Sequence, residues 1–355
     1  MISYLFVAGA LLSFSLRSNF HCNYKFNVSS FILYFFTVLF LLIFAGLREN
    51  VGFDFFSYKN IFYGYNDTPV EPLYNAIQFI TRLTGSYTFH LFFVAGISFL
   101  IKVYFFNKII DYKLQYIVLF FYFTSSFLML EMGVIRQSIA ASFVLGAIYF
   151  NATKKTSLFV LFSFLATLSH ISALAIVGLV LLFNVISLSR VNVLLMLSCS
   201  FLLMNLTNLF SSEISAVLVG FGDKYAVYTQ NFEPVGLTPG LFLKLLVFFV
   251  IYEVFNNRVK NDLAGLFVFI YFCGLCFFIA FNSVPILAAR LTSYFKVVEV
   301  VVFILFLLQF RAGPSRFFVF CILSIFSFAQ LIKFLNEEAV IKDYSHYSNF
   351  LFNVL

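Results

Sequence analysis

Long runs of apolar residues alternate with short polar connections along almost the whole chain. Most runs have about the length, roughly 20 residues, that an α-helix needs to cross a bilayer. They lack the short alternating segments that are typical of a transmembrane barrel. The pattern predicts an all-α polytopic membrane protein with about twelve spans, within a range of ten to twelve. The predicted spans are Ile2–Leu16, Ser30–Leu47, Thr88–Phe106, Leu114–Leu130, Val134–Phe150, two within Ser157–Ile186, Val191–Phe210, Pro239–Phe255, Leu263–Asn282, Phe295–Phe310 and Phe317–Leu335.

The run Ser157–Ile186 is too long for one typical span and too short for two. His170 lies near its middle, among serine and threonine residues. We therefore predict two short helices that meet at His170. A single span here would invert every later segment and would remove the charge asymmetry described below.

Two long polar connections, 48–87 and 211–238, interrupt the apolar pattern. In the first, charged residues and aromatic rings are concentrated between Arg48 and Tyr74. Glu71 and Pro72 suit the first turn of a helix, because proline needs no amide donor there and a carboxylate suits the positive helix end. This helix is predicted to place Leu73, Ile77, Ile80 and Leu83 on one face.

Composition supports lipid as the solvent of this chain. Residues are 62% hydrophobic and only 10% charged, whereas soluble domains carry about a quarter of charged residues. We predict one membrane-embedded domain over residues 1–355, because no polar block of domain size interrupts it. The net charge of +7 is explained by membrane topology and indicates no nucleic-acid partner.

Basic residues are concentrated in the connections on one side of the predicted membrane. Only Asp111, Glu253 and Asp262 are acidic on that side, so the positive-inside rule makes it cytoplasmic. Both chain termini and both long loops are then predicted to face outward. The basic residues assigned to the inner side are Arg17, Lys25, Lys102, Lys108, Lys113, Lys154, Lys155, Arg190, Arg258, Lys260, Arg311 and Arg316.

No pattern of a nucleotide or metal site is present. The chain lacks GxGxxG and GxxxxGK[ST], so a cytosolic nucleotide-sugar has no phosphate cradle. Cys273 and Cys276 form a CxxC pair inside an apolar run, without a second pair or a nearby histidine. We predict no metal and no other cofactor, and expect any chemistry at the outer face.

Charged residues at outer helix ends are the best candidates for a site, because burial near a bilayer costs free energy. Arg136 and Gln137 begin a helix whose small residues favour packing inside the bundle, where an arginine usually binds an anion or carboxylate. Arg290 lies among apolar residues, with Tyr294 one turn later. Arginine forks of this kind can neutralise a pyrophosphate without metal. The alternative is that Arg136 reaches the headgroups.

Asp54 and His170 are the candidate general bases. Asp54 lies in VGFDFFSY, four residues before Tyr58, so the two side chains share a face if this piece is helical. His170 titrates near neutral pH in its unperturbed state. The alternatives are a charged lid that only keeps the loop solvated, and a core histidine with satisfied hydrogen bonds.

The order and spacing of these motifs resemble one known family. Arg48 with VGFDFFSY, EPLY, IRQSIA, SHISAL and AARLTSYF look like the EpsG-like and Wzy-type O-antigen and exopolysaccharide polymerases. The resemblance covers most of the chain. It implies a bacterial inner-membrane glycosyltransferase with a GT-C-like fold, which joins undecaprenyl-pyrophosphate-linked oligosaccharide repeat units at the periplasmic face. Donor and acceptor would both be lipid-linked, within membrane lipid, and a flippase and a chain-length regulator would be partners.

The resemblance also implies roles for the candidate residues. Arg136 and Arg290 would bind the pyrophosphate, and Gln137 and Tyr294 would also contact the substrate. His170 would orient or deprotonate the acceptor hydroxyl. The residues that would shape the outer site are Arg48, Asp54 and Glu71.

Two other functions stay open from the sequence. One is a different enzyme on the same substrates, such as an O-antigen ligase or another lipid-linked-sugar glycosyltransferase. The other is a polysaccharide flippase or transporter. A flippase is expected to carry charges in the middle of its helices, whereas the charges here gather at outer helix ends.

Overall fold

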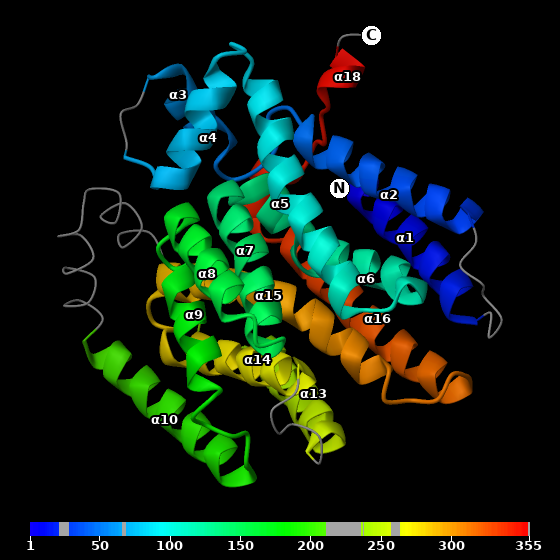
Figure 1. Cartoon of the computed structure of the whole chain (residues 1–355), viewed down its shortest axis with the longest axis vertical. Helices are drawn as coiled ribbons and strands as arrows, with labels where there is room; N and C mark the ends of the chain where they lie inside the picture. The colour runs from blue at the N-terminus through cyan, green and yellow to red at the C-terminus, as the bar shows by residue number, and fades with distance from the viewer. Residues whose placement is uncertain (21–27, 66–68, 211–235, 237, 257–262, 354–355) are drawn as a thin grey trace.

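The computed structural model describes the chain except residues 21–27, 66–68, 211–235, 237, 257–262 and 354–355 (Figure 1). Helices form its regular elements throughout the described part. They are α1 Ile2–Phe20, α2 Val28–Gly46, α3 Phe55–Tyr63, α4 Pro72–Arg82, α5 Tyr87–Ile109, η1 Tyr112–Leu114, α6 Gln115–Tyr122, η2 Phe123–Gly133, α7 Ile135–Ala152, α8 Thr156–Ser169, α9 Ala173–Leu182, α10 Arg190–Leu209, α13 Pro239–Phe255, α14 Leu263–Ala280, α15 Pro285–Leu307, α16 Pro314–Leu335, α17 Glu338–Tyr344 and α18 Phe350–Asn353. The all-α prediction is confirmed.

Each predicted apolar run contains a helix, but the number of spans stays a prediction. Among the described residues, six helices are long and apolar enough to cross a membrane. They are α2, α5, the continuous stretch Tyr112–Gly133, α10, α14 and α16. The polytopic membrane class follows from them. The second predicted loop, 211–238, lies almost entirely outside the described residues.

Two predicted element boundaries can be compared with the structure. The break at His170 is confirmed, since α8 ends at Ser169 and α9 begins at Ala173. The span predicted to begin at Phe295 begins instead at Pro285, which occupies the first turn of α15. This correction has a simple cause, because proline fixes the φ of a helix start. It places Arg290 and Tyr294 within α15 rather than before it.

The most buried elements are the stretch from α6 through η2 and the helix α7 that follows it. Of the apolar window in Tyr112–Gly133, 89% is buried inside the protein. Helix α7 contacts α5, α8, α9, α14 and α15, so other helices surround it. The two elements meet at Val134, two residues before Arg136. The start of α7 is therefore held by packing on almost every side.

Helices α3 and α4 lie together at one end of the helical body (Figure 1). The predicted start of α4 at Pro72 is confirmed. The apolar face predicted for it is divided between two environments, because Ile77 is 7% exposed whereas Ile80 and Leu83 are 56% and 80% exposed. The buried face also carries polar groups, and Thr81 shares a 2.7 Å hydrogen bond with His90 of α5. This bond compensates for burying the hydroxyl and imidazole groups. The spacing of apolar residues along the helix gives no sign of such a polar contact.

The two ends of the chain pack beside the start of the first long loop. The amino group of Met1 donates to the carbonyl of Ser345 at 2.9 Å. Arg48 forms an isolated antiparallel bridge with Asn349, and the amide of Phe350 donates to the carbonyl of Leu47. The first residue and the C-terminal segment therefore lie at the same end of the protein as the 48–87 loop, an arrangement consistent with a common side.

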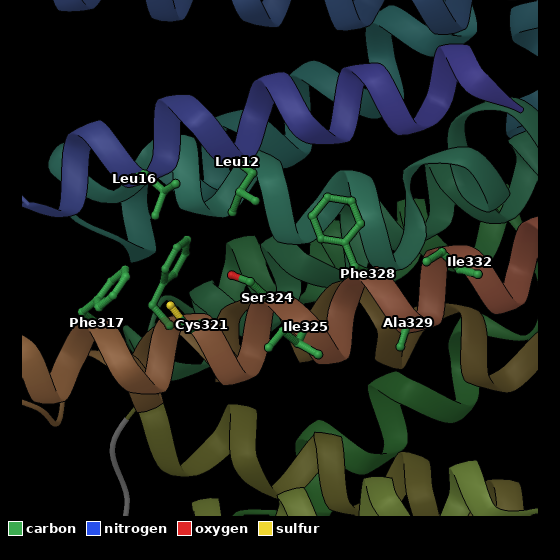
Figure 2. A pocket seen from close by; sticks show the side chains of 10 residues that line it. Leu12, Leu16, Phe317, Cys321, Ser324, Ile325, Phe328, Ala329 and Ile332 are labelled. Atoms are coloured by element: carbon green, nitrogen blue, oxygen red, sulfur yellow. The ribbon is translucent and has the colours of Figure 1, made fainter.

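A shallow apolar groove runs between α1 and α16 (Figure 2). Leu12 and Leu16 of α1 face Phe317, Phe328 and Ile332 of α16 across it. A surface groove with so few polar atoms suits contact with lipid chains. We assign it no role beyond the membrane-facing surface of the protein.

One charge assignment from the sequence is corrected by the structure. The sequence counts Lys102, within the predicted span Thr88–Phe106, among the charges of the cytoplasmic side, but this residue lies inside α5 and is fully buried. Its ammonium forms an ion pair of 2.9 Å with Glu131, which the same charge pattern leaves on the outer side. The pair satisfies both charges in the protein interior, so neither residue reports on membrane topology.

Candidate functional site

Arg136 lies in the first turn of α7 and contacts the first long loop at two points. Its Nη1 donates to Oε2 of Glu71 at 2.6 Å, and its Nε donates to the hydroxyl of Tyr58 at 3.3 Å. The guanidinium also lies 5.5 Å from the centre of the Tyr58 ring. About a fifth of each charged side chain is exposed, 21% for Arg136 and 20% for Glu71. The pair is thus fixed in position and still accessible.

A chain of polar groups continues from Glu71 to α15. Oε1 of Glu71 lies 3.7 Å from Nε2 of His170, and Nδ1 of His170 lies 2.7 Å from Oγ of Ser172. The same Ser172 oxygen is 2.8 Å from the hydroxyl of Tyr294. Four of the residues predicted from the sequence, Glu71, Arg136, His170 and Tyr294, are therefore brought together. They come from the first loop, α7, the α8–α9 break and α15.

The proton of the neutral His170 ring can be located from its contacts. The main-chain amide of Ser172 donates to Nδ1 at 3.3 Å, so Nδ1 is an acceptor and carries no proton. The proton of the neutral ring is then on Nε2, the nitrogen that lies 3.7 Å from Oε1 of Glu71.

Arg290 and Asp54 lie within electrostatic range of these polar groups. Burial raises the pKa of Asp54, and the charges of Arg136 and Arg290 act in the opposite direction. The charge of Arg290 also acts on His170. Asp54 precedes α3, where its side chain makes no capping hydrogen bond. Asp54, Arg136, His170 and Arg290 therefore share one electrostatic environment.

Arg48 and Gln137 are buried more deeply than the other candidates. Arg48 is 2% exposed and donates to the main-chain carbonyls of Ala45 at 2.6 Å and Val51 at 3.1 Å. Burial lowers the pKa of its guanidinium. These bonds hold the turn that leads to Asp54, so Arg48 supports the loop. Gln137 is 4% exposed in α7.

The turn after Arg48 depends on one glycine. Gly52 has a φ of +115°, and a Cβ at this position would overlap the main-chain oxygen of Met132. We expect Gly52→Ala to lower the stability of the purified protein by about 2 kcal/mol or more and to displace Asp54. Thermal unfolding measures the change.

Gly64 supplies the matched control for this prediction. It has a φ of +77°, but no atom lies within 4 Å of the position that a Cβ would take there. Gly64→Ala is expected to cost only the backbone strain, about 1 kcal/mol. Equal losses for the two variants would contradict the role given to the Gly52–Met132 contact.

Two residues of the site were not predicted as site residues from the sequence. Tyr58 is singled out there only for its spacing from Asp54, yet it binds Arg136 directly. Ser172 was missed, although it lies two residues after His170 in SHIS. A serine two residues after a histidine at a helix break can bind the imidazole locally. This spacing is the signal that would have indicated Ser172.

The fold and the site together define an all-helical membrane protein with an arginine–carboxylate–histidine site built on helix ends and loops. A family model described as the EpsG family matches residues 31–349, nearly the whole chain. The chain belongs to the EpsG family, a family of Wzy-like polymerases. This membership confirms the resemblance and supports a polysaccharide repeat-unit polymerase at a coarse level. No curated protein and no solved structure matches the chain.

Proposed function

We propose that this protein polymerises oligosaccharide repeat units that are carried on a lipid pyrophosphate, with undecaprenyl as the lipid. The observation that carries the proposal is the contact of Arg136 with Glu71 beside His170, in a membrane protein of the EpsG family. A guanidinium is suited to a pyrophosphate, and a carboxylate is suited to a hydroxyl proton. The two groups lie in one site, so both can act on a transfer between two lipid-linked sugars.

The acceptor hydroxyl oxygen attacks the anomeric carbon of the growing chain and forms the new glycosidic bond. The bond from that carbon to the lipid pyrophosphate breaks, and the pyrophosphate leaves with the electron pair. Glu71 takes the hydroxyl proton. His170 is the less suitable acceptor, because its Nε2, the ring nitrogen nearer to Glu71, already carries the ring proton. His170 therefore orients the Glu71 carboxylate, and Ser172 fixes the position of the imidazole ring.

The Arg136–Glu71 pair links the two halves of this reaction. Before the reaction, the carboxylate balances the charge of Arg136 across a 2.6 Å contact. When Glu71 becomes protonated, Arg136 keeps an uncompensated positive charge while negative charge develops on the pyrophosphate. The interaction is thus stronger in the transition state than in the ground state, which is the condition for a gain in rate. Arg290 would add a second positive charge to the same leaving group.

Asp54 is the second candidate for the proton acceptor. Burial raises its pKa, which brings a carboxylate closer to the range of an effective base. We assign it to sugar binding, because Glu71 has a direct contact with Arg136 and Asp54 lies farther along the loop. A comparison of rates for Asp54→Asn and Glu71→Gln tests this assignment.

The proposed location is the periplasmic face of the bacterial inner membrane, with twelve spans and both termini outside. The charge pattern of the short connections supports this orientation. The packing of Met1 and Phe350 near the 48–87 loop is consistent with it. A flippase that delivers repeat units and a chain-length regulator are the proposed partners.

The glycan profile of a strain that lacks this gene tests the proposal. We expect single repeat units, without polymer, on the lipid carrier or on its final acceptor. The intact gene should restore the polymer. Polymer that accumulates on the carrier in the deletion strain would indicate a ligase. Repeat units that stay on the cytoplasmic side would indicate a flippase.

A further inference from the structure

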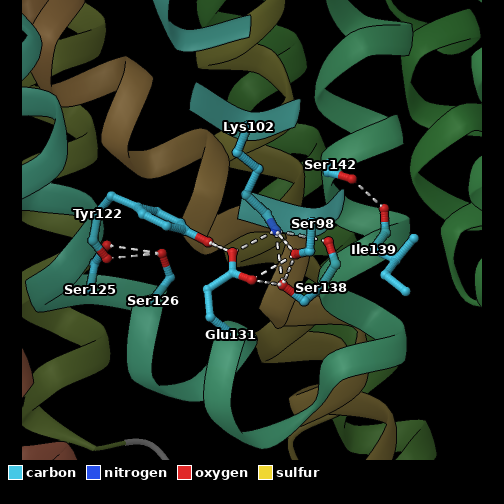
Figure 3. A network of polar contacts seen from close by, with 9 residues as sticks. All are labelled: Ser98, Lys102, Tyr122, Ser125, Ser126, Glu131, Ser138, Ile139 and Ser142. Atoms are coloured by element: carbon cyan, nitrogen blue, oxygen red, sulfur yellow. Dashed lines mark hydrogen bonds and ion pairs between the residues drawn. The ribbon is translucent and has the colours of Figure 1, made fainter. Parts of the chain in front are cut away.

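A second cluster of charged and polar side chains lies in the protein interior (Figure 3). Its centre is the ion pair between Lys102 of α5 and Glu131 of η2, with both side chains fully buried. Ser98, Tyr122 and Ser138 surround the pair. We call these five residues the Lys102–Glu131 network. Buried charge costs free energy, so a network of this kind needs an explanation beyond stability.

The network satisfies its charged groups with several hydrogen bonds. The Lys102 ammonium donates to Oε1 of Glu131 at 2.9 Å, to Oγ of Ser98 at 2.7 Å and to both oxygens of Ser138 at 2.8 Å. The other Glu131 oxygen accepts from Ser98 at 2.7 Å and from Ser138 at 3.0 Å. The Tyr122 hydroxyl also donates to Glu131. So many directed bonds fix the relative positions of α5, α6, η2 and α7.

Ser138 connects this network to the candidate site through the geometry of α7. It lies two residues after Arg136 in the same helix. Successive residues of an α-helix are rotated by about 100°, so these two side chains project roughly 200° apart. A rotation of α7 that directs Ser138 to Glu131 therefore directs Arg136 to the opposite side, where Glu71 and Tyr58 lie.

The connection between Glu131 and α7 also supports the first long loop. Met132 lies against Gly52, and Gly133 lies against Phe53, the residue before Asp54. The amide of Val134 donates to the carbonyl of Met129 at 2.9 Å, which closes the corner. The corner at 132–134, which the network holds, therefore contacts the first long loop beside Asp54 and continues into α7, which carries Arg136.

We propose that Lys102 and Glu131 are positioning residues that fix the rotation of α7 and so place Arg136 against Glu71. Neither residue touches substrate. The inference rests on the proposed function, because polymer formation is its readout. The competing explanation is a network that contributes to folding alone.

A double substitution separates these explanations. Lys102→Met with Glu131→Leu removes both charges and keeps similar volume, a type of change that often leaves a protein folded. We expect monodisperse protein at wild-type abundance and a polymerisation rate lowered about tenfold or more, because small misplacements of a binding group lower rates strongly. The matched control is Arg190→Gln with Glu253→Gln, an exposed ion pair of 3.0 Å that should leave the rate unchanged.

The decisive measurement combines the double substitution with Arg136→Lys. If the network acts through Arg136, its loss should cause little further decrease once Arg136 is impaired. If it acts on folding alone, the two decreases should multiply, and this result would overturn the proposal. An unchanged rate in the double variant would overturn it as well.

Two milder variants keep the test valid if the double variant does not fold. Ser138→Ala and Tyr122→Phe each remove one hydroxyl from the network. Each should lower the rate by roughly threefold. Combined with Arg136→Lys, each should cause little further decrease in the rate. If the rate decreases of Ser138→Ala and Tyr122→Phe each multiply with that of Arg136→Lys, the proposal is also rejected. Failure of the wild-type gene to restore polymer would instead reject the proposed function.

Discussion

Arg136→Lys is expected to lower the rate of polymer formation about a hundredfold or more while the protein stays folded. Lysine keeps the positive charge but has no planar fork, so it cannot bind Glu71, Tyr58 and a pyrophosphate oxygen at once. Loss of one preorganised donor to a developing anion costs a similar factor in other enzymes. The measurement is polymer length and yield in the complemented deletion strain, at matched protein abundance.

Arg190→Lys is the matched control for this substitution. Arg190 also pairs with a carboxylate, Glu253 at 3.0 Å, but it is 67% exposed. We expect no change in polymer, because exposed ion pairs contribute little. Wild-type polymer from Arg136→Lys would exclude a bidentate role for this arginine and would leave Arg290 as the main pyrophosphate ligand.

Glu71→Gln is expected to have the largest effect of the substitutions considered. The amide keeps the shape of the side chain, so it can still accept a hydrogen bond from Arg136, but it cannot take a proton. The loss of a general base lowers rates by about 10² to 10⁴-fold. Binding of a lipid-linked acceptor should change much less than the rate, so single-turnover and binding measurements on the purified protein distinguish the two effects.

Two further variants define what the Glu71 result means. His170→Asn should lower the rate less than Glu71→Gln, about tenfold, because it removes the group that orients the carboxylate and leaves the base. Glu338→Gln, at an exposed position of α17, should have no effect. A His170 variant that is more impaired than the Glu71 variant would return the role of base to the histidine.

The sequence predicted those features whose cause lies close by in the chain. Pro72 begins a helix because its ring fixes φ, and the polar residues around His170 interrupt an apolar run. Arg136 was indicated by its position at a helix start beside small residues. Each of these signals is local, so no knowledge of packing was needed.

The features that were not predicted depend on contacts between distant segments. Lys102 and Glu131 are far apart in the chain, and a count of charges by membrane side assigns them to opposite faces. The position of Arg48 in the protein depends in part on the C-terminal segment, where Asn349 forms a bridge with it. The polar residues on the buried face of α4 were not predicted for the same reason, since His90 on another helix supplies their polar partner.

The helix break at His170 has a consequence for the depth of the reaction. Helix α8 has 14 residues and so a length of about 21 Å, which is shorter than the ~30 Å hydrocarbon layer. If Lys154 and Lys155 mark the inner boundary, as the charge pattern predicts, His170 lies roughly 9 Å below the outer one. A sugar hydroxyl would then have to reach below the level of the headgroups, while the lipid carrier would keep its tail in the bilayer throughout the transfer.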